Sequence, residues 1–186
     1  MTFWNDAKIQ PKRSYRFLMS VVGANTAVKN FLIKKVTKPS FSISESEHKF
    51  LKHTFYYPGK LTWNEVNFTI VDVVDPVDNA SAAVMEILEA SGYRTPVSEG
   101  VTSTISKELA VGAMSSVIIR QIDSEGKNVE AWKLHNPWIK DVSFGDLDYD
   151  SEDLLNVEIT LRYDNAISQF KGRGKLPSNA VSADLL

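Results

Sequence analysis

The chain has no cysteine and only three histidines among its 186 residues. Without cysteine it has no disulfide framework, no thiolate nucleophile and no cysteine-based metal site. The histidines His48, His53 and His135 lack the i, i+4 spacing of paired zinc ligands. We therefore expect neither a zinc site nor cysteine chemistry.

Long hydrophobic runs are also absent. No stretch approaches the ~18 consecutive apolar residues that a membrane-spanning helix needs. The N-terminal residues MTFWNDAKIQPKRS have mixed polarity and lack the apolar centre of a secretory signal. We expect a protein that is made in the cytosol and stays soluble.

The motifs of common enzyme classes are missing or fall in the wrong context. No G-x-S-x-G nucleophile motif occurs. Ser124 and Lys127 match S-x-x-K but lie in a hydrophilic turn, and the run from Gly172 to Lys175 is too short for a phosphate-binding loop. We predict that the protein is not an enzyme.

The acidic stretch 141–158 is the strongest candidate for a metal site, with seven carboxylates and no Lys or Arg. An Asp-x-Asp-x-Asp run from Asp146 imitates the start of a calcium-binding loop. However, Ser151 occupies the sixth position, where glycine allows the turn, and Val157 the twelfth, where a bidentate Glu is needed. We interpret the stretch as an exposed acidic turn and predict no metal or other cofactor. A small metal-dependent enzyme would require a bound ion here.

Charge is unevenly distributed although the net charge is only −2. Residues 1–60 hold 11 Lys and Arg against 3 Asp and Glu, whereas residues 61–186 hold 10 against 20. Such segregation can simply reflect two solvated faces. It also suits a molecule that meets its own copies head to tail, because opposite faces attract.

Short β-branched and aromatic runs between turn residues predict a mainly β protein. The expected strands are a hairpin of 13–22 with 29–37, a short extended piece at 41–44, a pair 48–57 and 65–74 joined by a loop at Pro58-Gly59, strands 116–123 and 129–139, and a half-buried strand within 154–166. Apolar and polar residues alternate most cleanly between Val157 and Asp164. One convincing helix is predicted at about 76–91, with Asp75 as its cap and Gly92 at its end.

The expected fold is an antiparallel β-barrel or sandwich with that single helix plugging one opening. Residues 93–112 are polar and rich in Ser and Thr, and we interpret them as a long loop that can contain a strand. The chain length favours a single domain over residues 1–186, with a flexible tail from about residue 171.

Three consecutive aromatic residues, Phe55, Tyr56 and Tyr57, stand just before Pro58-Gly59. Aromatic residues beside basic ones, here and at 15–17, could form a platform for single-stranded nucleic acid. Packing in a core or an interface explains aromatic residues in strands more simply. A nucleic-acid-binding barrel remains the alternative from another functional class.

The C-terminal block 132–166 resembles the closing signature of tail tube proteins from contractile-tailed bacteriophages. In that family a W-x-L strand with a later Pro is followed by a turn with Gly and Asp, then by an alternating strand that ends in an aromatic-acidic pair. Those positions are occupied here by Trp132, Leu134, Pro137, Gly145, Asp146, Leu147, Val157, Ile159, Leu161 and Tyr163. The segment YYPGKLTWNEVNFTIVDVVDP is similar to the family's middle section, and the order of elements matches over roughly 13–170.

The resemblance implies a structural subunit of the inner tail tube, in which β-barrels join into six-membered rings with a continuous inner barrel. Rings stack head to tail into a conduit for genome ejection, surrounded by a sheath protein, filled during assembly by a tape-measure protein and started by a baseplate initiator. It implies location in the virion tail, with assembly in the host cytoplasm. DNA would pass the lumen without specific binding, and no membrane is involved. A tube initiator or baseplate protein, or the tube of a phage-derived injection system related to type VI secretion, stays open.

Two candidate surfaces follow. An apolar segment at 48–60 would form an inter-subunit arm that reaches the adjacent ring, although an ordinary intramolecular hairpin is the alternative; its candidate residues are Lys49, Lys52, Phe55, Tyr56, Tyr57, Pro58, Gly59 and Lys60. An acidic surface would face either the lumen, where it repels DNA phosphates, or the basic face of an adjacent ring. Its candidate residues are Asp141, Asp146, Asp148, Asp150, Glu152 and Asp153.

Overall fold

The computed structural model describes residues 10–22, 27–28, 32–74, 79–95 and 104–170. Its N-terminal strands are β1 (Phe17–Val22), β2 (Ala27–Val28), β3 (Ile33–Val36), β4 (Phe41–Phe50), β5 (His53–Trp63) and β6 (Val66–Val71). Two helices follow, α1 (Ala80–Ala90) and α2 (Lys107–Ala113). The C-terminal strands are β7 (Ser116–Ile122), β8 (Asn128–His135), β9 (Trp138–Ser143), β10 (Asn156–Arg162) and β11 (Asn165–Phe170).

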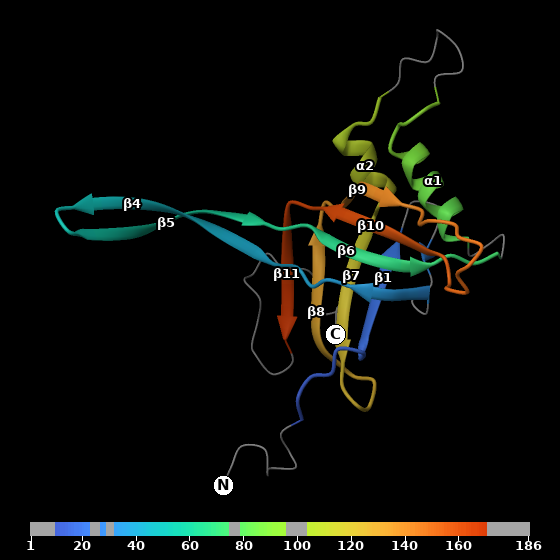
Figure 1. Ribbon diagram of the computed structural model, residues 1–186, viewed down its shortest axis with the longest axis horizontal. Coiled ribbons are helices and arrows are strands. Elements are labelled where there is room, and N and C mark those ends of the chain that lie inside the picture. Colours follow the sequence, from blue (N-terminus) through green and yellow to red (C-terminus); the bar gives the residue numbers. More distant parts are fainter. Residues whose placement is uncertain (1–9, 23–26, 29–31, 75–78, 96–103, 171–186) are drawn as a thin grey trace.

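The strands form two sheets and a separate two-stranded ribbon. One sheet has the order β11-β8-β7-β1-β2, the second has the order β3-β6-β10-β9, and β4 and β5 form a two-stranded sheet. All pairings are antiparallel. The strands of the two larger sheets cross steeply, as in orthogonally packed β-sandwiches (Figure 1). The expectation of a mainly β, antiparallel fold is confirmed.

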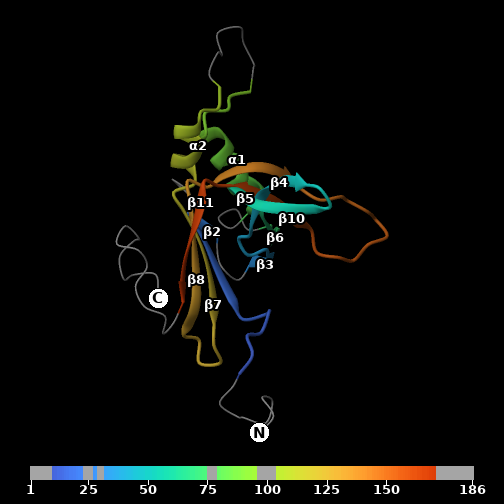
Figure 2. The ribbon, with the colours of Figure 1, turned by 90° about the vertical axis from the view of Figure 1, so that its left-hand side faces the viewer.

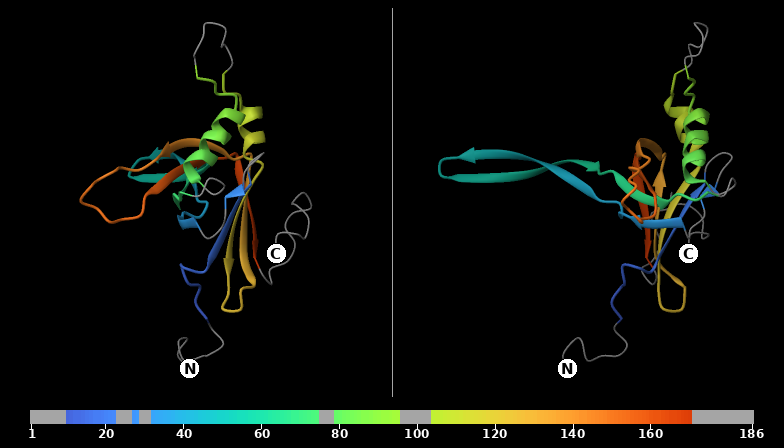
Figure 3. Two further views of the ribbon diagram at one scale, coloured as in Figure 1. Left: turned by 90° about the vertical axis from the view of Figure 1, so that its right-hand side faces the viewer. Right: turned by 45° about the vertical axis from the view of Figure 1, so that its right-hand side comes forward.

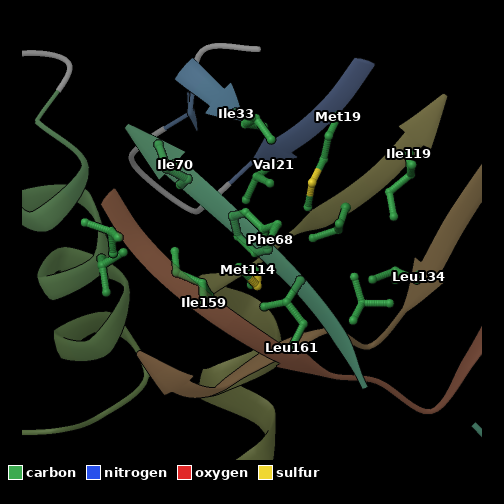
Figure 4. Close-up of a cluster of buried hydrophobic side chains, with 14 of the residues drawn as sticks. Met19, Val21, Ile33, Phe68, Ile70, Met114, Ile119, Leu134, Ile159 and Leu161 are labelled. Atoms are coloured by element: carbon green, nitrogen blue, oxygen red, sulfur yellow. The ribbon is translucent and has the colours of Figure 1, made fainter. Parts of the chain in front are cut away.

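The hydrophobic core lies between these two sheets (Figure 4). β10 contributes Val157, Ile159 and Leu161, which are buried, while Glu158 between them is exposed. This is the period-2 pattern that the sequence predicts, because successive side chains of a strand point to opposite faces. Buried side chains of the facing sheet complete the core, among them Met19, Val21, Val117, Ile119 and Leu134.

The helix α1 begins later than expected. Its N-cap is Asn79, whose side chain accepts a hydrogen bond from the Ala82 amide, and not Asp75. The Asp72 carboxylate accepts hydrogen bonds from the Ala80 amide (3.0 Å) and the Ser81 hydroxyl (2.6 Å), which places negative charge at the positive end of the helix. The helix begins at Ala80 and not at the predicted residue 76. Residues 75–78 themselves lie outside the described residues.

A second helix, α2, lies within the segment that we interpreted as a loop. Ser106 caps it by accepting a hydrogen bond from the Leu109 amide. Lys107 is held by Asp164, with Nζ–O distances of 2.9 and 3.0 Å. The two helices lie together at one end of the sandwich, and α1 places Ala80 and Val84 in the core (Figure 2). Within the described part of the chain, neither helix has the length and apolar character needed to cross a membrane.

Several predicted pairings are also corrected. The expected hairpin of 13–22 with 29–37 does not form as such: β1 pairs with β2 and β7, whereas β3 pairs with β6 in the other sheet. The expected strand 129–139 divides into β8 and β9 at Asn136, which has a left-handed backbone (φ 52°). The strands around the 124–127 turn and the strand within 154–166 are confirmed as β7, β8 and β10. β11 was not predicted, and the tail from 171 lies outside the described residues.

The largest correction concerns residues 41–63. Instead of a turn at Pro58-Gly59, the chain turns at Leu51-Lys52, and Pro58 and Gly59 lie inside the long strand β5. We call the ribbon of β4 and β5 the arm. It leaves the sandwich and extends alone to one side (Figures 1 and 3). The piece expected at 41–44 is the first part of β4.

Candidate assembly surfaces

The arm is fixed to the sandwich at its root. The Asn64 amide donates to the Ser40 carbonyl (2.8 Å), and the Thr37 amide donates to the Asn67 carbonyl (2.8 Å). The Trp63 ring lies 5.5 Å from that of Phe41, at a steep angle, and contacts the core cluster. These contacts set the direction in which the arm leaves the sandwich.

Beyond its root, no third layer covers the arm among the residues that the structure describes. Every residue of β4 is exposed, and so is every residue of β5 before Trp63. At about 3.4 Å per residue, the ten residues of β4 span roughly 30 Å. A two-stranded ribbon of this kind has marginal stability in water on its own. The exposed apolar side chains of the arm are Phe41, Ile43, Phe50, Leu51, Phe55, Tyr56, Tyr57 and Leu61.

A β-bulge at Gly59 and Lys60 changes which side chains of β5 share a face of the arm. The register passes from Ile43–Leu61 to Glu45–Pro58, so β5 carries one extra residue there. The Lys60 amide donates to the Ser44 hydroxyl oxygen (2.9 Å). A Cβ on Gly59 would lie 2.4 Å from the Ser44 Oγ, so this position has no room for a side chain.

The register separates the three predicted aromatic residues. Phe55 is opposite His48 and Tyr57 is opposite Ser46, whereas Tyr56 is opposite Glu47. Since paired residues share a face, Phe55 and Tyr57 lie on one face of the arm and Tyr56 on the other. All eight predicted arm residues lie on the ribbon or its turn, and all are exposed.

Sequence reasoning missed the apolar inner half of the arm. Phe41 is opposite Trp63 and Ile43 is opposite Leu61, which forms an apolar patch near the root. The available signal was the pair of alternating segments, F-S-I at 41–43 and L-T-W at 61–63. Assigning the turn to Pro58-Gly59 concealed that these segments face one another.

A nearly buried carboxylate anchors the segment that precedes the arm. Glu130 of β8 is 4% exposed. It accepts hydrogen bonds from Lys12, from the Trp132 indole and from Lys38 (3.0 Å). Burial raises the pKa of Glu130, but these hydrogen bonds outweigh burial and bring the pKa down to about 2. Because Lys38 lies three residues before Phe41, the ion pair ties the approach to the arm to the five-stranded sheet.

The predicted acidic residues fall into two groups. Asp141 lies on β9 opposite Thr160, and all six carboxylates are exposed. The other five lie in the loop 144–155 between β9 and β10, which we call the acidic loop; they are Asp146, Asp148, Asp150, Glu152 and Asp153. Among the described residues no group of three or more His, Asp or Glu side chains is arranged to hold a metal ion.

Comparison with protein families gives one match. The family model described as T4-like virus tail tube protein gp19 matches residues 95–166. This range contains the whole of the block 132–166 that carries the resemblance noted in the sequence. No curated protein matches the chain.

Comparison with solved structures gives similar folds over most of the chain. A chain in an extracellular contractile injection system, PVC sheath–tube complex in the extended state, has a TM-score of 0.63 at 18% identity and covers 91% of this chain and 99% of its own. A chain of the anti-feeding prophage baseplate has a TM-score of 0.62 at 15% identity, covering 87% and 97%. A chain of the PVC sheath/tube terminator has a TM-score of 0.61 at 18% identity, covering 88% and 99%.

The predicted resemblance to tail tube proteins is therefore confirmed, in sequence by the matched family and in fold by these structures. The matched family is one of structural tube proteins, which also confirms the prediction of a structural protein and not an enzyme. At these identities the solved structures show the fold alone.

Replacing Glu130 should reveal the strength of its anchor. A fall in pKa from 4.5 to about 2 corresponds to about 3 kcal/mol of stability. Because the folded-state pKa is lowered, this contribution is present above pH 4.5 and is lost as pH falls toward 2. In denaturant titrations of the protomer, the wild type should lose more stability than Glu130→Gln between pH 5 and pH 3. Parallel pH profiles would contradict the assignment.

Placing alanine at Gly59 should loosen the arm without unfolding the core. The added Cβ displaces the Ser44 hydroxyl and breaks its bond with the Lys60 amide, a loss of about 1 kcal/mol. Hydrogen exchange of the arm amides should accelerate in Gly59→Ala, while the global free energy of unfolding stays within error. Gly112→Ala is the matched control, because nothing lies within 4 Å of its added Cβ. Unchanged exchange in the arm of Gly59→Ala would show that the bulge tolerates a side chain.

Proposed function

We propose that this protein is a structural subunit of the inner tail tube of a contractile-tailed phage, and that it works by assembling with copies of itself. The observation that carries the proposal is the arm, because the described residues of one copy leave its apolar side chains uncovered. The match to a tail tube family over residues 95–166 and the shared fold support the same reading.

In the proposed tube, six copies form a ring and the arm of each copy lies against the adjacent ring. Contact with a neighbour would bury the exposed side chains on both faces of the ribbon, including Phe55 and Tyr57 on one face and Tyr56 on the other. Ordering a marginally stable ribbon costs conformational entropy, and burial of apolar surface at the contact would offset that cost. Without a neighbour, these aromatic side chains of the arm stay exposed to water.

The sheet edges support closure into a ring. Within the described strands, β11 and β9 each pair on one side only, with β8 and β10 respectively. Open edges present unpaired backbone groups and favour pairing with another chain. In a closed ring these edges would find partners in the neighbouring copies, which would join the sheets into a continuous inner barrel.

We propose that Asp141 faces the lumen. Ile159 and Leu161 point into the core, so Thr160 and its partners Asp141 and Asn67 lie on the outer face of the four-stranded sheet. Asp141, Thr160 and Asn67 suit a wall along which DNA must slide, because they offer no positive charge to its phosphates. Arg162 lies on the same face of β10, and its charge is paired with Glu65 (3.5 Å).

The proposed tube requires further partners outside the chain. A sheath surrounds it, a tape-measure protein occupies it during assembly, and a baseplate component starts it. The tube of a phage-derived injection system and a baseplate initiator are the alternatives within this class. The chains with similar folds come from injection-system assemblies, so we retain the tube of an injection system as the main alternative.

Removing the three aromatic residues should separate folding from assembly. The triple variant Phe55→Ala, Tyr56→Ala, Tyr57→Ala should keep the circular dichroism and melting temperature of the wild type, because these side chains lie outside the core. Negative-stain electron microscopy should show rings or tubes for the wild type and none for the variant. The paired variant Tyr93→Ala, Leu109→Ala removes exposed apolar groups elsewhere and should assemble. Normal tubes from the triple variant would contradict the role of the arm.

Assembled tubes should also reveal which charges face the lumen. Wild-type tubes should not retain a short fluorescent single-stranded oligonucleotide, whereas tubes of Asp141→Lys should retain it at low salt and release it at high salt. Glu125→Lys, in the turn between β7 and β8, is the control for the change in net charge. Salt-sensitive binding by wild-type protomers would instead favour the nucleic-acid-binding alternative. No retention by the Asp141 variant would place that residue outside the lumen.

A further inference from the structure

A basic groove lies between the edge strand β3 and the five-stranded sheet. It has a volume of about 620 Å³. Lys34, Lys35 and Arg120 line it, together with the apolar or aromatic side chains of Val36, Trp132 and Tyr15. Tyr15 is 71% exposed, so part of the aromatic lining is open to solvent. The groove therefore combines positive charge with apolar surface.

Most of the positive charge of this groove has no carboxylate partner among the described residues. Lys38, at the same groove, pairs with Glu130, but the described residues offer no carboxylate partner to Lys34, Lys35 or Arg120. The register between Ile33 and Lys35 skips one residue, which makes Lys34 the extra residue of a β-bulge. Bulges of this kind change the direction of a side chain at a sheet edge.

The acidic loop has the opposite character. None of its five carboxylates pairs with a Lys or Arg among the described residues. Leu147 is 89% exposed and Tyr149 is fully exposed, which leaves large apolar groups in water at the centre of the loop. The loop has local order, because the Asp148 carboxylate accepts a hydrogen bond from the Asp150 amide (3.0 Å). It projects from the four-stranded sheet between β9 and β10 (Figure 2).

We propose that the basic groove of one copy receives the acidic loop of a second copy. The carboxylates would meet Lys34 and Lys35, while Leu147 and Tyr149 would cover the apolar wall formed by Val36 and Trp132. Complementary charge fixes the orientation and register of such a contact, and the buried apolar groups supply its affinity. The second copy is the natural partner, because each chain carries both surfaces and joins neither to the other by an ion pair in its described part.

This inference rests on the proposed function, since it identifies one contact through which tube subunits recognise each other. It is separate from the arm, whose exposed residues lie on β4, β5 and their turn. It also divides the acidic residues by role, with Asp141 on a sheet face and the loop carboxylates at a contact between copies. A head-to-tail polymer needs two different complementary surfaces on each subunit, and the groove and the loop are such a pair.

Charge reversal tests the contact directly. Lys34→Glu with Lys35→Glu, and separately Asp146→Lys with Asp148→Lys, should each raise the protein concentration needed for tube assembly by at least about tenfold, because like charges then face each other. A chain that carries all four substitutions should assemble again near the wild-type concentration. Matched controls are Arg94→Glu with Lys127→Glu, and Glu89→Lys with Glu125→Lys, which change net charge equally at other sites. Assembly is followed by light scattering and negative-stain microscopy.

Each outcome decides a different question. Failure of the wild type to form rings or tubes would contradict the proposed function itself. Wild-type tubes together with normal assembly of both reversed variants would overturn only the groove–loop contact. Loss of assembly in both variants without rescue in the combined chain would also overturn it, because the two surfaces would then meet different partners. Rescue in the combined chain alone supports the direct contact.

Discussion

A two-stranded ribbon has two faces and no layer of its own to cover either of them. The arm is subject to this constraint on both faces, because Phe55 and Tyr57 lie on one face and Tyr56 lies on the other. Hydrogen bonds between β4 and β5 cannot by themselves offset the conformational entropy of ordering so many residues away from a core. In the proposed tube, the arm is therefore the part of the fold that a second copy completes.

Contacts at the root of the arm fix the direction of a ribbon that has no further support along its length. Trp63 contacts the core cluster, and Lys38 is held by Glu130 on the opposite sheet. These contacts join the arm to both larger sheets, so its direction follows from the rigid packing of the sandwich. The bulge at Gly59 acts farther out, where it decides which side chains share a face. A contact made by the outer half is thus linked mechanically to the core.

Sequence patterns were sufficient where one face of a strand is buried, as in β10, because burial enforces alternation between Val157 and Leu161. They failed at Pro58, because proline is normally absent from the interior of a strand. In a two-stranded ribbon each strand has one side without partners, so a missing amide hydrogen can be tolerated. The seven-residue helix α2 was missed because it is too short for a periodic pattern. The candidate arm residues all lie on the ribbon of β4 and β5 or in its turn, but the apolar inner half of the ribbon and the position of its turn required the register.

Counting charges along the chain predicted two opposed surfaces but could not tell which charges remain available. Lys12 and Lys38 belong to the basic N-terminal third, and folding pairs both with Glu130. Lys34 and Lys35 belong to the same third, at the edge strand β3, and the part of the chain that the structure describes gives them no carboxylate partner. An ion pair formed within the subunit adds to its stability and no longer attracts a partner, whereas an unpaired charge contributes to recognition. In the proposed contact between copies, the recognising surface therefore consists of the charges that the fold leaves unpaired.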